Sequence, residues 1–98
     1  MSDYPAGTVL LNGYIDVPAD RLDAVQVALK KHIELTRAEA GCIFFKVDPS
    51  EQIAGRFLVS EAFVNQTAFD AHQQRAGQSD WAKVSEGIPR KYEITTVE

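Results

Sequence analysis

The sequence holds a single cysteine, Cys42, among its 98 residues. One cysteine cannot form an internal disulfide, and because stable disulfides mark oxidising compartments, we expect a protein of the reducing cytoplasm. Cys42 itself is interpreted most simply as a small buried hydrophobic residue. Long apolar runs are lacking too: no segment approaches the roughly 18 apolar residues that a membrane span needs, and no basic, apolar secretion signal opens the sequence. We therefore expect a cytoplasmic location and no membrane partner.

Motifs of several common chemistries are also missing. The two histidines, His32 and His72, form no HxxxH pair, and CxxC does not occur, so nothing indicates a metal site. No GxGxxG or GxxxxGKS/T loop supports nucleotide binding, and no GxSxG elbow indicates a serine hydrolase. If the chain is an enzyme, we expect it to work without a tightly bound cofactor or metal.

An excess of positive charge is absent as well: 10 Lys and Arg residues stand against 14 Asp and Glu, and the formal net charge is -4. Nucleic acids attract basic proteins, so we expect no nucleic-acid partner. Hydrophobic residues make up 45% of the sequence, an ordinary globular value that argues against disorder. The length suits one domain, which we expect at residues 8–98, after a flexible N-terminus of residues 1–7.

Four segments have the composition of β-strands. Residues 9–17 are rich in β-formers and apolar at most positions. Residues 43–48, 56–63 and 92–97 are similar, and a turn at residues 49–55 joins the second strand to the third. Near-continuous apolar strands are typical of strands that are buried on both faces.

Helices are predicted between these strands. Pro18 and Asp20 can start a long amphipathic helix, whose apolar residues recur at three- and four-residue spacing. Gly41 is placed to end that helix in the left-handed conformation that glycine adopts easily. Asn65 can cap a second helix that stops at Gly77.

A short third helix precedes the last strand. Ser79 can cap it, and Pro89 breaks it. The apolar side chains that it carries toward the core are Trp81, Val84 and Ile88. The order of elements is therefore β-α-β-β-α-β with one extra helix. This order predicts an α+β, ferredoxin-like fold, an antiparallel sheet with helices on one face.

The strands of this sheet are apolar on both faces. The uncovered face of such a sheet normally meets water and is polar. The first strand instead has apolar residues on both sides, Val9, Leu11 and Ile15 on one and Leu10 and Tyr14 on the other. Since the chain has no second layer for that face, we expect a closed homodimer in which two sheets pack against each other.

Glu61 and His72 are the residues best suited to acid–base chemistry. Glu61 shares a strand face with Phe57 and Phe63, where a carboxylate either finds a partner or has a raised pKa. His72 lies on the apolar stripe of the second helix, so its imidazole should point inward. An inward imidazole beside an inward carboxylate is an arrangement that general-base catalysis uses. The alternatives are an ion-paired Glu61 at a strand end and a His72 that only fills the core.

Five further residues are candidates for a ligand site. Asn12 interrupts the apolar first strand, and its amide could orient a ligand or form a hydrogen bond on a dimer face or strand edge. His32 lies close to the apolar stripe of the long helix, so it either marks the helix flank or lines the same cavity. Phe69 and Trp81 either fill the core or hold an aromatic substrate, and Phe57 is a further candidate for substrate contact.

Several short motifs occur in an order that resembles a known family. They are Thr36-Arg37-x-Glu39-x-Gly41-Cys42, Phe45-x-Val47, the strand from Phe57 to Phe63 with Glu61, Ala68-Phe69-x-x-His72 and Ser79-x-Trp81. Together they resemble the antibiotic biosynthesis monooxygenase domain over residues 8 to 97, and within that family the quinol monooxygenases. The resemblance implies a dimeric α+β barrel, which agrees with the two-sided sheet.

The resemblance also implies a monooxygenase that acts on a hydroxylated aromatic or quinol with molecular oxygen and without metal or flavin. A deprotonated, electron-rich phenol can supply the electrons that a cofactor normally provides. The protein must then supply an apolar pocket, a base and a polar group for the oxygen adduct. On this hypothesis His72 is the base or a proton relay, and Glu61 orients it. Asn12 would donate a hydrogen bond to substrate or peroxide, and Phe69 and Trp81 would form pocket walls.

Other functions of this fold stay open at this point. Haem-degrading relatives use a strand Asn, a helical Trp and an iron-ligating His. Only Asn12 matches, because the other two positions fall on His72 and near Ser85, so haem degradation is not favoured. Small isomerases of the autoinducer-processing type, which move protons within a hydroxyketone, would use the same His72 and Glu61. A dimer that binds a ligand without turnover is the third alternative.

Overall fold

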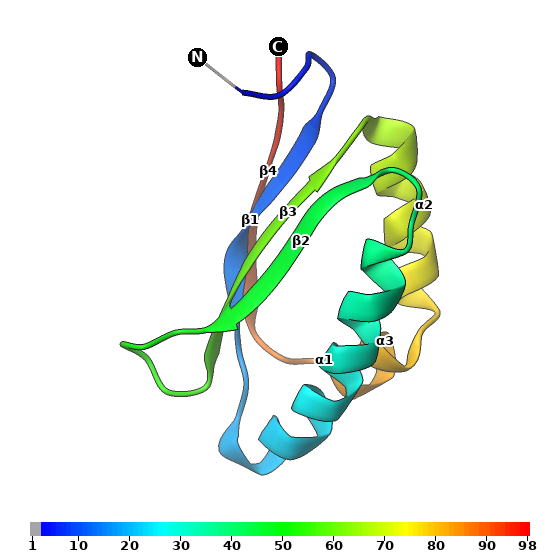
Figure 1. The fold of residues 1–98 in the computed structure, drawn as a ribbon. Helices are drawn as coiled ribbons and strands as arrows, with labels where there is room; N and C mark the ends of the chain where they lie inside the picture. The colour runs from blue at the N-terminus through cyan, green and yellow to red at the C-terminus, as the bar shows by residue number, and fades with distance from the viewer. Residues whose placement is uncertain (1–2) are drawn as a thin grey trace.

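The computed structural model describes residues 3–98 (Figure 1). Its elements in chain order are β1 (Val9–Asp16), a 3-10 turn (Ala19–Arg21), α1 (Leu22–Arg37), β2 (Cys42–Pro49), β3 (Arg56–Phe63), α2 (Gln66–Gly77), α3 (Asp80–Val84) and β4 (Arg90–Thr96). In this part of the chain no helix is both long and apolar enough to cross a membrane.

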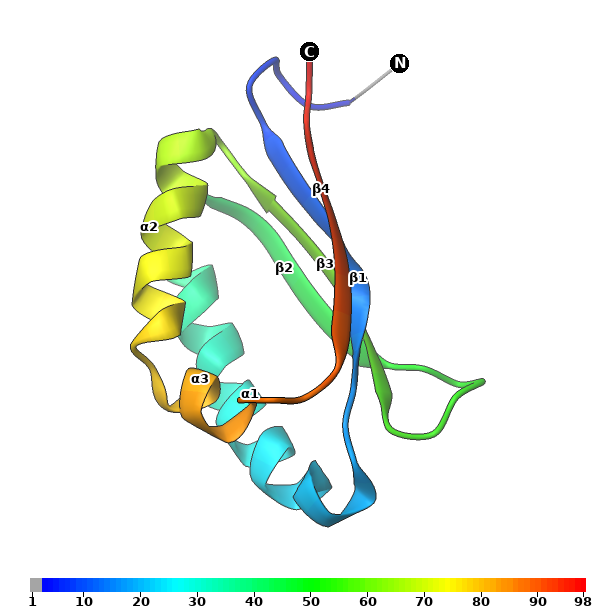
Figure 2. The same cartoon turned by 180° about the vertical axis from the view of Figure 1, so that it is seen from behind.

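The four strands form one antiparallel sheet in the order β2-β3-β1-β4. Figure 1 and Figure 2 show all three helices on the same face of the sheet, which we call the helix side; the other face is the outer side. The predicted α+β, ferredoxin-like arrangement is therefore confirmed.

The strand bounds agree with the prediction to within two residues, and the largest difference lies at β4. This strand begins at Arg90 instead of Tyr92, because the ladder with β1 extends to the pair Ile15–Arg90. Pro89 does not prevent this pairing, since its carbonyl still accepts a hydrogen bond of 2.9 Å from the Asp16 N–H. As a result, Arg90 is a strand residue on the helix side.

The core lies between the helix side of the sheet and the helices. Two buried clusters form it, one with Ile15, Val17, Val25, Leu29, Phe57 and Ile88, the other with Val9, Leu11, Val59, Phe63 and Phe69. Full burial of an aliphatic or aromatic side chain contributes roughly 1.5–3 kcal/mol, so these clusters supply most of the stability. Cys42 packs, partly buried, against the second cluster, as expected of a small hydrophobic residue.

The predicted start of the long helix is wrong in part. Ala19–Arg21 form a 3-10 turn, and α1 begins at Leu22 with Arg21 as N-cap and no side-chain cap from Asp20.

The predicted N-caps Asn65 and Ser79 have different outcomes. The side chain of Asn65 accepts a hydrogen bond of 2.8 Å from the Ala68 N–H, so this cap is confirmed. Ser79 precedes α3, but its side chain does not cap that helix. Its hydroxyl instead donates to the Ala76 carbonyl at 2.6 Å, and its N–H donates to the same carbonyl at 3.2 Å, since the carbonyls at the end of α2 lack their usual donor in a following turn.

The prediction for Gly41 is wrong. Helix α1 ends earlier, at Arg37 with Ala38 as its C-cap, and Gly41 is not among the glycines with positive φ. Its importance is steric: a Cβ at this position would lie 2.3 Å from the Cβ of Ala68 on α2. Gly41 therefore allows the start of β2 to pass close to α2.

Gly41→Ala is expected to lower the free energy of unfolding by roughly 1–3 kcal/mol, because α2 must move away from the sheet to make room. Chemical denaturation of both proteins measures the difference. Gly77→Ala is the matched control, since a Cβ there meets nothing within 4 Å. The control should keep or slightly raise the stability, and an equal loss in both variants would contradict the steric explanation.

The outer side of the sheet combines apolar and charged residues. Leu10 and Tyr14 are half-buried there, while Leu58 is 50% exposed. Arg56 forms two hydrogen bonds to Asp16, of 2.7 and 2.9 Å, and its guanidinium lies 3.6 Å from the centre of the Tyr14 ring. The homodimer expected from this face stays a prediction.

The N-terminal segment meets the end of the chain. The Gly7 N–H donates to the Val97 carbonyl at 2.8 Å, and Thr8 is buried. The expected flexible segment of residues 1–7 begins with residues 1–2, which lie outside the described part of the chain. Its flexibility and the domain boundary at residue 8 stay predictions.

Candidate active site

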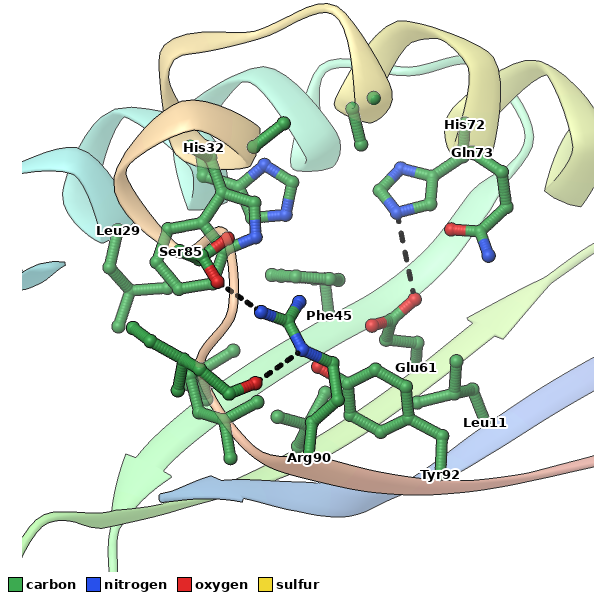
Figure 3. A pocket seen from close by; sticks show the side chains of 18 of the residues that line it. Leu11, Leu29, His32, Phe45, Glu61, His72, Gln73, Ser85, Arg90 and Tyr92 are labelled. Atoms are coloured by element: carbon green, nitrogen blue, oxygen red, sulfur yellow. Dashed lines mark hydrogen bonds and ion pairs between the residues drawn. The ribbon is translucent and has the colours of Figure 1, made fainter. Parts of the chain in front are cut away.

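A cavity of about 630 Å³ lies between the helix side of the sheet and the helices (Figure 3). Apolar side chains such as Leu11 and Phe45 line it together with a few polar ones. Small-molecule sites usually have volumes of about 300–1,000 Å³ and this mixed lining. The cavity is therefore of a suitable size for a small aromatic molecule.

His72, on α2, lies at the wall of this cavity between two carboxylates. Its Nδ1 is 2.8 Å from Oε1 of Glu39, which is a hydrogen bond. Its Nε2 is 3.7 Å from Oε1 of Glu61, which is an ion-pair distance but too long for a hydrogen bond. Figure 3 shows His72 and Glu61 pointing toward each other from α2 and β3. The contact that orients the imidazole is thus made by Glu39, while Glu61 faces its other nitrogen.

Glu39 follows the end of α1 and is itself held in place by Arg75 of α2. The Arg75 Nε donates to Oε2 of Glu39 at 3.0 Å, and a terminal nitrogen donates to the Thr36 hydroxyl at 2.9 Å. The Thr36 hydroxyl in turn donates to the His32 carbonyl at 2.7 Å. This network joins α1 to α2 and fixes the carboxylate against which His72 rests.

Glu61 is the buried carboxylate that the strand alternation predicts. Its side chain is 8% exposed, and within residues 3–98 its Oε1 has no hydrogen-bond partner. Burial, with a smaller contribution from the negative charge of Glu39, raises the pKa of Glu61 from 4.5 to about 7. A carboxyl group with this pKa can take up or release a proton near neutral pH.

The protonation of His72 follows from its surroundings. Burial lowers its pKa below the ordinary 6.5, although the hydrogen bond to Glu39 opposes this shift. The imidazole is then neutral near pH 7, and because Nδ1–H donates to Glu39, the lone pair lies on Nε2. That lone pair faces Glu61, so Nε2 can accept the proton of Glu61 when the two groups approach to hydrogen-bond distance.

His32 and Trp81 form an aromatic wall of the cavity. Their rings are stacked, with centroids 5.1 Å apart and planes 10° apart, and the His32 ring meets Phe45 edge-on at 5.3 Å. His32 is 5% exposed, so it lines the cavity and does not mark the helix flank. Burial lowers its pKa to about 4, with a smaller effect from His72, so His32 is neutral at pH 7. A flat wall of this kind suits an aromatic ring.

Two further polar side chains of the cavity, Arg90 and Tyr92, lie on β4. Figure 3 shows Arg90 beside Ser85, and Tyr92 between Arg90 and Glu61. Burial raises the pKa of the Tyr92 phenol, while the positive charge of Arg90 opposes the shift and the charge of Glu61 adds to it. The cavity therefore has two polar regions, one at Glu61 and His72 and the other at Arg90 and Tyr92. The aromatic wall of His32 and Trp81 lines the same cavity.

Three of the predicted site residues do not line this cavity. Asn12 lies on the outer side, since strand alternation directs it away from Leu11, and there its side-chain oxygen accepts a hydrogen bond of 2.9 Å from the Ser60 hydroxyl. This contact matches the alternative of a hydrogen bond on the outer face. Phe57 and Phe69 are 6% and 5% exposed and belong to the two core clusters, so they fill the core.

Sequence reasoning did not assign roles to Glu39, Arg75, Arg90 and Tyr92. Glu39 lies in a turn, where no periodicity indicates the direction of a side chain. Its place in the motif that starts at Thr36 was the only available sign. The sequence of β4 has no apolar alternation that would show which side chains face the helices. Arg90 and Tyr92 reach the cavity because β4 is the edge strand next to β1.

Comparison with known structures supports the fold. A protein from Nitrosomonas europaea, provisionally described as an antibiotic biosynthesis monooxygenase, is 22% identical with a TM-score of 0.82, over 97% of this chain and 94% of the other. A protein from Bacteroides thetaiotaomicron, described as a conserved protein of unknown function and possible oxidoreductase, is 20% identical with a TM-score of 0.81, over 94% and 99%. At these identities the likeness shows the fold alone.

Comparison of the sequence with protein families gives a more specific result. No curated protein matches the chain. The family model for antibiotic biosynthesis monooxygenases matches residues 8–84, which include His72, Glu61 and Glu39. Because this match covers most of the sequence, the protein belongs to the antibiotic biosynthesis monooxygenase family.

Proposed function

We propose that this protein is a cofactor-independent monooxygenase that acts on a hydroxylated aromatic or quinol and uses molecular oxygen. The observation that carries the proposal is the position of His72, 2.8 Å from Glu39 and 3.7 Å from Glu61 at the wall of an apolar cavity. Membership of the family supports an oxygenase-type role. The site supplies the base that such a reaction requires.

The reaction begins when the pair of Glu61 and His72 removes a proton from the substrate. The electron-rich anion transfers an electron to oxygen, and the two radicals combine to form a carbon–oxygen bond, which gives a hydroperoxide after protonation. Loss of water then breaks the O–O bond and the C–H bond at the same carbon and leaves a carbonyl group. The balance is RH₂ + O₂ → RO + H₂O, so the substrate supplies every electron that oxygen accepts.

Each residue of the site has a distinct role in this scheme. Glu61 and Nε2 of His72 are the two groups that can take up the proton, and Glu39 holds the imidazole in the tautomer that leaves Nε2 free. Trp81 and His32 provide the flat wall against which the ring of the substrate lies. Asn12 has no part in the scheme, because its side chain lies on the outer side.

Oxygen uptake by chelator-treated protein, offered a panel of hydroquinones and other polyhydroxylated aromatics, tests the proposal. Uptake well above autoxidation is expected for at least one class of substrate. With ¹⁸O₂, one labelled atom should appear in the product and the other in water. If no member of the panel raises uptake above autoxidation, the oxygenase proposal is rejected.

The same pair also supports a second candidate function, an isomerase that moves a proton between carbon atoms of a hydroxyketone. The pKa of about 7 for Glu61 suits a group that both removes and returns a proton. Such an enzyme would exchange carbon-bound hydrogen of its substrate with deuterium from D₂O in the absence of oxygen. Exchange without oxygen uptake would favour the isomerase.

A further inference from the structure

Arg90 provides a positive charge at the cavity that no carboxylate pairs with in residues 3–98. Arg90 Nε donates to the Ile88 carbonyl at 3.1 Å, and one terminal nitrogen donates to the Ser85 carbonyl. Glu86 also lines the cavity, but it forms no ion pair with Arg90 in this part of the chain. The charge of Arg90 is therefore available to a ligand.

The two carbonyl contacts also fix the direction of the guanidinium. A guanidinium has five N–H donors in a rigid plane, and the bonds to Ser85 and Ile88 use only some of them. Figure 3 shows these bonds on one side of Arg90, with Tyr92 and Glu61 toward the other. A group held in this way loses little conformational entropy when it binds an anion.

We infer that the ligand of this cavity is a hydroxylated aromatic with an anionic oxygen, such as a carboxylate, at the end opposite its reactive hydroxyl, and that Arg90 binds this oxygen. Arginine pairs with carboxylates through charge-assisted hydrogen bonds. The hydroxyl would then lie at Glu61 and His72, and the ring against Trp81. The assignment of the reacting end rests on the proposed function; the binding of the anion by Arg90 does not.

Arg21 offers a matched control, because it makes the same kind of structural contact without lining the cavity. One of its terminal nitrogens donates to the Glu86 carbonyl at 2.9 Å, and the other donates to the Val84 carbonyl. Arg21→Gln thus removes carbonyl contacts at the end of α3, as Arg90→Gln does, but leaves the cavity charge in place. If the carboxylate preference were lost only because these carbonyl contacts are broken, both variants would lose it.

The experiment compares 4-hydroxybenzoate with its neutral analogue 4-hydroxybenzamide by isothermal titration calorimetry at pH 7.5, without oxygen. The wild type should bind the carboxylate about tenfold more tightly, a moderate value because Arg90 is exposed to water. Arg90→Gln should bring the two affinities together, while Arg21→Gln should keep the preference. Fluorescence of Trp81, the only tryptophan, provides a second measure of occupancy in the cavity.

Three results would overturn the inference: equal affinities in the wild type, a preference that survives in Arg90→Gln, or a preference that is lost equally in Arg21→Gln. Failure of 4-hydroxybenzoate to bind at millimolar concentration would also overturn it. Measurement of oxygen uptake distinguishes failure of this inference from failure of the proposed function. A charge preference without uptake would leave an anion-selective binding site, and uptake without a charge preference would remove only the role of Arg90.

Discussion

Replacement of His72 with alanine is expected to lower turnover by a factor of about 10²–10⁴, the usual contribution of a general base. The variant loses Nε2, which lies 3.7 Å from Oε1 of Glu61 and is the proposed acceptor of its proton. Glu61 alone, with a pKa of about 7, would often be protonated at neutral pH and would have no imidazole to which it could pass the proton. Initial rates of oxygen uptake at saturating substrate measure the effect.

Two comparisons show whether the effect of His72→Ala is chemical. Asn12→Ala also replaces a polar side chain, but on the outer side of the sheet, so its turnover should stay close to that of the wild type. Thermal unfolding of both variants tests whether the fold persists, because His72 is 3% exposed and its loss leaves a cavity. A folded His72→Ala protein with near wild-type turnover would exclude His72 as the base.

The positions of Glu61 and His72 could be predicted because both lie in regular elements. Alternation along β3 puts Glu61 on the same face as Val59 and Phe63, and the helical period of α2 puts His72 on the face of Phe69. The structure brings the two side chains to 3.7 Å. The partner that orients His72 was not predictable in this way, since Glu39 lies in a turn and its direction depends on Arg75.

Close packing and irregular backbone account for the other differences. The pattern around Gly41 predicts the end of a helix, but the reason for glycine there is the neighbouring Ala68 of α2, 27 residues further along the chain. For the aromatic side chains the sequence could not separate core from pocket wall. Phe57 and Phe69 fill the core, whereas His32, for which the sequence favours a position on the helix flank, lines the cavity. Composition alone does not distinguish a core wall from a pocket wall.

Glu61→Gln is expected to change how stability depends on pH. The folded protein has a Glu61 pKa of about 7, against an ordinary value of 4.5, so between these pH values it holds a proton that the unfolded chain has released. Stability must therefore fall as pH rises through this window, by up to about 3 kcal/mol, and stay constant above it. His32 has the opposite effect: its pKa of about 4 makes stability rise between pH 4 and 6.5.

The two effects oppose each other in the wild type, so the informative quantity is the difference in free energy of unfolding between the wild type and Glu61→Gln. Urea denaturation from pH 4.5 to 8 should show that the wild type loses about 3 kcal/mol of stability relative to Glu61→Gln between pH 4.5 and 7. Above pH 7 the difference should stay constant. Val59→Ala is the control, since it perturbs the same face of β3 without removing a titrating group. Its difference from the wild type should be the same at every pH. A difference for Glu61→Gln that is equally constant would mean that Glu61 titrates normally, and its role as a group that exchanges a proton near neutral pH would have to be abandoned.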